Sequence, residues 1–179
     1  MSLPQDITTG TNVPKPLVPG VKKGFLDYCE KGRLAGYPIT GVRMILADGA
    51  HHEVDSSEKA FYTAAQGCFR EYFKQAGPKL LEPIMNVEIE CPEDFQGTVV
   101  GDVIRRRGIM TSNDIVESVS VIKAEVPLAE TFGYATDLRS LTQGQGTFTM
   151  ELATYRQVPS NIQEEIIEEK KKQQLVGAK

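Results

Sequence analysis

The sequence predicts an α+β protein of two domains, a partial βαβ-type domain followed by a ferredoxin-like βαββαβ sandwich. Two adjacent stretches support this prediction most strongly. In residues 84–91 apolar side chains alternate with polar ones, which is the pattern of a strand with one buried face. Residues 93–107 then repeat apolar side chains at helical spacing and close on three arginines before Gly108, as is typical of a helix C-terminus.

The second domain, expected over residues 83–158, continues this alternation of strand and helix. Its further strands are predicted at 109–112, 116–126 and 147–156, and its second helix at 128–142. The resulting order, βαββαβ, places both helices on one face of an antiparallel sheet. Residues 159–179 are expected to form a C-terminal tail helix, because acidic residues come first and lysines last.

The first domain is expected over residues 1–82. Its first helix places three apolar side chains on one face, those of Val21, Phe25 and Cys29. A strand is predicted in residues 37–49, because Val42, Met44 and Leu46 alternate with their neighbours. Since a single strand cannot form a sheet, we interpret this domain as the back part of a larger one.

A second helix is predicted after a short loop, from Asp55 to near Gly77. Asp55 and Glu58 have the spacing of a capping box. The apolar residues at helical spacing, which predict the buried stripe of this helix, are Phe61, Ala65, Cys68 and Tyr72.

Composition excludes several classes of protein. No stretch of the 179-residue sequence approaches the roughly 18 consecutive apolar residues of a membrane span. The N-terminus lacks the basic and apolar regions of a secretion signal. Cys29, Cys68 and Cys91 are predicted to be buried free thiols in a reducing compartment. A formal charge of −4 argues against a generally basic nucleic-acid binder, so any contact with a polyanion must be local.

Few motifs could support chemistry. The sequence has no G-x-x-x-x-G-K-[ST] phosphate loop, and residues 144–146 are predicted to form a hairpin turn. His51 and His52 are adjacent, so they diverge on a short loop and make a poor pair of metal ligands. The run Arg105–Arg107 fits two interpretations, a solvated helix end that compensates the helix dipole and a phosphate-binding group.

Several long runs resemble the C-terminal part of translational elongation factor G. They are VDSSEKAF at 54–61, LEPIMNVE at 81–88, GDVIRRRG at 101–108, AEVPL at 124–128 and FGYATDLRSLT at 132–142. The resemblance extends from about Val13 to Ser160 with the runs in the right order. The DGAHH loop and the QGQG turn are similar to the mitochondrial-type branch, which also has bacterial members.

The resemblance implies a fragment of a ribosomal translocase, which is a GTPase of five domains. Residues 1–82 would then be part of domain four, residues 83–158 domain five, and residues 159–179 the tail. The family's phosphate loop lies far upstream, so we expect this chain itself to be no enzyme and to bind no cofactor, whereas the parent protein uses GTP and Mg. The expected protein is a monomer of the bacterial cytoplasm, or alternatively of the mitochondrial matrix, with no membrane partner.

The resemblance also implies a tip loop that enters the decoding centre of the ribosome beside transfer RNA and messenger RNA. This tip loop consists of Gly49, Ala50, His51 and His52. The family's tip histidine falls at His52.

A second implied contact is with ribosomal RNA at the sarcin–ricin loop and the stalk base. Its candidate residues are Arg105, Arg106, Arg107, Phe132 and Gly133. Three alternatives stay open: a related ribosome-recycling factor, a ferredoxin-like module that binds a small regulatory ligand, and a metal enzyme that uses His51 and His52.

Overall fold

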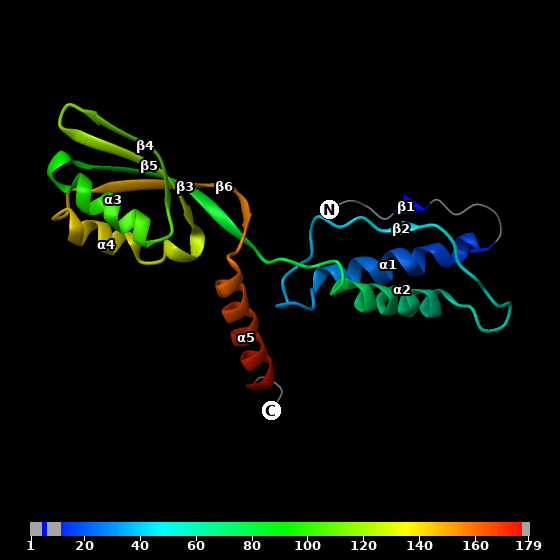
Figure 1. Cartoon of the computed structure of the whole chain (residues 1–179). Coiled ribbons are helices and arrows are strands. Elements are labelled where there is room, and N and C mark those ends of the chain that lie inside the picture. Colours follow the sequence, from blue (N-terminus) through cyan, green and yellow to red (C-terminus); the bar gives the residue numbers. More distant parts are fainter. Residues whose placement is uncertain (1–4, 7–11, 177–179) are drawn as a thin grey trace. The chain divides into compact units, whose positions relative to one another are not determined.

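The structure, a computed structural model, describes residues 5–6 and 12–176. Its contacts divide the chain into two compact units (Figure 1). Unit 1 comprises residues 1–78 together with 160–179, and unit 2 comprises residues 79–159. The expected boundary at residues 82 and 83 lies a few residues too late, because the first strand of unit 2 already begins at Leu81. None of the described helices is long and apolar enough to cross a membrane.

Two helices that lie side by side form the centre of unit 1, α1 (Val18–Glu30) and α2 (Glu58–Phe73) (Figure 1). Gly20 and Gly24 allow this close approach, since a Cβ atom at either would collide with the α2 backbone at Glu58 or Tyr62. The aromatic rings between the helices meet edge to face, with 5.2 Å between the ring centroids of Phe25 and Phe69.

The α2 helix differs from the prediction in which of its side chains are buried and in the residue at which it begins. Tyr72 and Cys68 are exposed, and the side chains that pack toward α1 include Phe69 and Phe73. The helix also begins later than predicted, because Ser57 and not Asp55 is the N-cap, with its hydroxyl accepting the Ala60 N–H at 3.1 Å. Cys29 and Cys91 are buried free thiols as predicted.

The strand predicted over residues 37–49 is almost wholly irregular. Only β2 (Ile45–Leu46) is regular, and it pairs in parallel with β1 (Gln5–Asp6). The remaining elements of unit 1 are a short 3-10 helix, η1 (Lys15–Leu17), and the tail helix α5 (Ser160–Val176). The tail helix groups with unit 1 through contacts such as Lys170 over the ring of Tyr37.

Unit 2 has the predicted βαββαβ order. Its strands are β3 (Leu81–Pro92), β4 (Ile109–Val116), β5 (Val119–Pro127) and β6 (Thr147–Gln157). They form one antiparallel sheet in the order β4-β5-β3-β6. The helices α3 (Gln96–Arg105) and α4 (Tyr134–Leu141) cover one face of it (Figure 1). The α+β fold of two domains is therefore confirmed.

The core of unit 2 lies between the sheet and these two helices. Val87, Ile89 and Cys91 point into it from β3, opposite Ala124, Ile122 and Ser120 of β5 in the strand register. The helices contribute Val99, Val103, Tyr134 and Leu138. This core holds the ends of α3 and α4 in place, and both candidate contacts of unit 2 lie near those ends.

Both helices of unit 2 are shorter than predicted. Each begins after a 3-10 turn, η2 (Glu93–Phe95) before α3 and η3 (Leu128–Glu130) before α4. Gly133, with φ of 77°, separates η3 from α4. The predicted hairpin turn at 144–146 is instead the end of α4, where the Gly144 N–H donates to the Arg139 carbonyl. The β4–β5 turn lies at Glu117 and Ser118, both with positive φ.

Candidate nucleic-acid interface

The backbone of the tip loop is held by hydrogen bonds to the start of the following helix. The His52 N–H donates to the Ser56 hydroxyl at 2.7 Å, and the Ser56 N–H donates to the His52 carbonyl at 3.1 Å. The His52 side chain itself is 74% exposed, and its nearest charged partner, Asp55, is 3.9 Å away. This arrangement presents an exposed imidazole on a backbone that is held by hydrogen bonds.

The other end of the loop is held by an upstream segment that the sequence did not indicate. Asp48 accepts the Gly49 N–H at 2.8 Å and the Asn12 side-chain amide at 2.9 Å. These two bonds, the one from Asn12 first, hold the pKa of the Asp48 carboxyl below its ordinary value. A Cβ atom on Gly49 would lie 2.7 Å from Val13, so only glycine allows this close packing.

The two histidines of the tip loop have different surroundings. His51 Nδ1 lies 3.1 Å from the Asn12 carbonyl oxygen, which requires a hydrogen on that nitrogen and fixes the ring. The ring of His52 has no such backbone partner among the described residues. Within the described part of the chain, no three His, Cys, Asp or Glu side chains gather into a metal site.

The three arginines at the end of α3 have three different backbone positions. Arg105 is the last helical residue, Arg106 is the C-cap, and Arg107 adopts a left-handed conformation with φ of 59°. The Gly108 N–H donates to the Val103 carbonyl and the Arg107 N–H to the Ile104 carbonyl, which is the Schellman arrangement. Gly108 therefore lies two residues beyond the C-cap, and glycine is needed there because a Cβ atom would meet Val103 at 2.6 Å.

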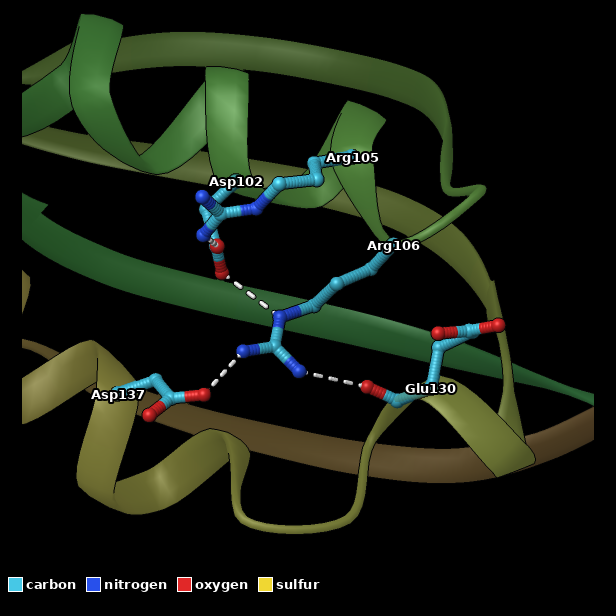
Figure 2. A network of polar contacts seen from close by, with 5 residues as sticks. All are labelled: Asp102, Arg105, Arg106, Glu130 and Asp137. Atoms are coloured by element: carbon cyan, nitrogen blue, oxygen red, sulfur yellow. Dashed lines mark hydrogen bonds and ion pairs between the residues drawn. The ribbon is translucent and has the colours of Figure 1, made fainter.

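Arg106 lies at the centre of a polar network between α3 and α4 (Figure 2). Its side chain is 14% exposed. Nε donates to Asp102 at 2.8 Å, Nη1 to the Glu130 carbonyl at 2.7 Å, and Nη2 to Asp137. The guanidinium carbon also lies 4.9 Å from the centroid of the Tyr134 ring, within cation–π distance.

Arg107 is bound on two sides. Its Nη1 and Nη2 donate to the two carboxylate oxygens of Glu82, each at 2.9 Å, and its Nε donates to Glu130 at 2.9 Å. The bonds to Glu82 outweigh the effect of burial and raise the pKa of Arg107. Arg107 thus links the start of β3 to η3.

Two candidate side chains of unit 2 remain open to solvent. Arg105 is 74% exposed, although one of its nitrogens contacts Asp102. Phe132 is 78% exposed, which is unusual for so large an apolar side chain. The sequence alone does not distinguish the three arginines, whereas in the structure only Arg105 of the three is largely exposed.

Comparisons with known proteins agree with the resemblance. A family model described as elongation factor G, domain IV, matches residues 4–77, and one described as elongation factor G C-terminus matches residues 79–166. Elongation factor G of Rhodopirellula baltica is 71% identical over 175 residues, which cover 98% of this chain and 25% of that protein. The mitochondrial elongation factor G of Drosophila mojavensis is 48% identical over 172 residues, which cover 96% and 23%.

A crystal structure of a protein from Thermus thermophilus shares the fold. It superimposes with a TM-score of 0.83 at 36% identity, over 94% of this chain and 26% of that chain. The chain thus spans about a quarter of the length of these relatives. The two family models meet at residues 77 and 79, where the contacts of the structure also divide the chain, and together they match nearly all of it. The chain belongs to the elongation factor G family.

Proposed function

We propose that this chain is the C-terminal part of a ribosomal translocase that moves transfer RNA and messenger RNA during elongation. The observation that supports this best is the exposed imidazole of His52 on a loop whose backbone is held at both ends. A loop that presents an exposed hydrogen-bonding side chain on a held backbone suits recognition of RNA by shape. The names of the compared relatives favour elongation over ribosome recycling.

In this proposal the tip loop occupies the decoding centre and prevents the RNAs from moving back. The chain performs no GTP hydrolysis of its own, because a phosphate loop and Mg would belong to the upstream part of the parent protein. The protein acts as a monomer in the bacterial cytoplasm, with the mitochondrial matrix as the alternative compartment.

The second proposed contact places unit 2 against ribosomal RNA of the sarcin–ricin loop and the stalk base. Phe132 offers an aromatic face on which a base can stack, and Gly133 beside it leaves the backbone accessible. Arg105 offers a solvent-facing guanidinium for phosphate. This contact is local, as the net acidic charge of the chain requires.

The proposal is tested with a grafted factor, the elongation factor G of Rhodopirellula baltica in which this chain replaces the matching 175 residues. We expect the grafted factor to move messenger RNA on bacterial ribosomes at a rate close to that of the unaltered relative. Single-turnover fluorescence of a labelled messenger measures that rate. A grafted factor that hydrolyses GTP on the ribosome but leaves the messenger in place would contradict the proposal.

Arg105→Glu in the grafted factor is expected to weaken ribosome binding and to reduce its dependence on salt. Loss of one phosphate contact lowers the slope of log affinity against log salt concentration by about one, because fewer counterions are released. Titrations at several salt concentrations measure the slope. Arg70→Glu on the exposed side of α2 changes the charge equally and should leave the slope unchanged. Equal slopes for both variants would show that Arg105 is only a solvated helix end.

A further inference from the structure

Arg106 and Arg107 are poorly placed to bind phosphate. Each uses its nitrogens on partners within unit 2, Arg106 on three residues and Arg107 on two. The whole cluster contains three guanidiniums, those of Arg105, Arg106 and Arg107. Against them stand four carboxylates, those of Glu82, Asp102, Glu130 and Asp137. The positive charge of Arg106 and Arg107 is therefore compensated inside the protein, and a phosphate would have to displace existing ion pairs to reach these two side chains.

The partners of these two arginines surround one short segment. Arg106 donates to the Glu130 carbonyl on one side of it and to Asp137 on the other, and its guanidinium lies over the ring of Tyr134. Arg107 donates to the Glu130 carboxylate. Between these attachment points lie Thr131, Phe132 and Gly133, the segment with the most exposed aromatic side chain of unit 2.

The local structure of that segment agrees with a fixed conformation. Thr131 is buried, and both its N–H and its hydroxyl donate to the Leu128 carbonyl, at 3.0 and 2.8 Å. The Tyr134 N–H donates back to the Thr131 carbonyl at 3.1 Å. With both sides held, the left-handed Gly133 turns the chain so that Phe132 points into solvent.

We propose that Arg106 and Arg107 are positioning residues, which hold the segment Thr131–Gly133 so that Phe132 is presented to the ribosome. The inference rests on the proposed function only for the identity of the partner. A planar guanidinium is needed at position 106, because three acceptors lie around it in different directions and a lysine ammonium cannot reach all of them.

The positioning role is tested first in the 179-residue chain by hydrogen exchange. Arg106→Lys keeps the charge but loses the planar guanidinium and its several donors. We expect the amides of Thr131 and Tyr134 to exchange about tenfold faster in this variant. Arg105→Lys is the matched control and should leave both amides unchanged. If Arg106→Lys unfolds unit 2, Asp137→Asn removes only one attachment point and should give a smaller acceleration of the same amides. Exchange that is unaltered in the folded variants would overturn the inference.

A double-mutant cycle in the grafted factor then separates positioning from direct contact. We expect Arg106→Lys to weaken ribosome binding about fivefold and to have no further effect once Phe132→Ala is present. Independent, multiplying effects would mean that Arg106 acts without Phe132, which contradicts a positioning role. If Phe132→Ala alone leaves binding unchanged, the proposed ribosomal contact of Phe132 is wrong, and the exchange rates alone decide whether the arginines hold the segment.

Discussion

Asp102→Ala is expected to lower the free energy of unfolding of unit 2 by about 3–5 kcal/mol. The Asp102 side chain is only 2% exposed, and its carboxylate accepts bonds from both Arg105 and Arg106 (Figure 2). Removing it leaves the guanidinium of Arg106, itself largely buried, without one of its two carboxylate partners. The cost is large because a buried charge cannot regain its lost partner from water.

Urea denaturation of the chain, followed by far-ultraviolet circular dichroism, measures this loss in the transition of unit 2. Glu88→Ala is the matched control, since Glu88 also forms an ion pair within unit 2, with Lys123 at 3.0 Å, but both side chains are substantially exposed. The control should cost about 1 kcal/mol or less. If Asp102→Ala costs no more than the control, the network contributes little to stability and the case for its positioning role is weakened.

His52→Ala in the grafted factor is expected to slow messenger movement about tenfold, which corresponds to about 1.4 kcal/mol of transition-state stabilisation. The melting temperature should not change, because the exposed imidazole buries little surface and its contact with Asp55 is long. Calorimetry and single-turnover messenger fluorescence measure the two quantities. His51→Ala is the neighbouring control and should slow movement less, since the His51 ring bonds to the Asn12 carbonyl.

The fold of unit 2 was predictable because its sequence signals are local. Strand alternation in β3 and helical spacing in α3 each follow from burial of one face, and the βαββαβ order follows from their succession. Helix limits were less predictable. Gly133 interrupts an otherwise helical pattern, and Arg107 occupies a left-handed position that usually favours glycine.

Unit 1 was predicted less well because an alternating sequence pattern wrongly indicated a long strand. The alternation around Met44 resembled a strand, but among the described residues of that stretch only Ile45 and Leu46 pair with another strand. In α2, the side that packs against α1 is set by the glycines of α1, and no pattern within α2 itself shows where those glycines lie. Periodicity therefore predicted a helix there but only part of its buried face, because Ala65 lies against Gly24 of α1 whereas Cys68 and Tyr72 are exposed.

The candidate sites, too, were predictable only where local sequence patterns determine them. A loop histidine such as His52 is exposed because short polar loops are, so its availability was predictable. The ion pairs of Arg107 were not predictable, because its partners Glu82 and Glu130 lie 25 and 23 residues away in the sequence. Asn12, which holds the tip loop through Asp48, is 36 residues away and belongs to no motif. Only the folded chain brings these groups together.

The most direct test of the proposed function measures messenger movement and GTP hydrolysis in the same single-turnover experiment, for the grafted factor with and without His52→Ala. A tip-loop residue that acts on the RNAs should affect movement alone, because hydrolysis takes place in a different part of the parent protein. We predict about a tenfold loss of movement rate with an unchanged hydrolysis rate. Equal movement rates in the two proteins, or a parallel loss of movement and hydrolysis, would contradict the role of the tip loop.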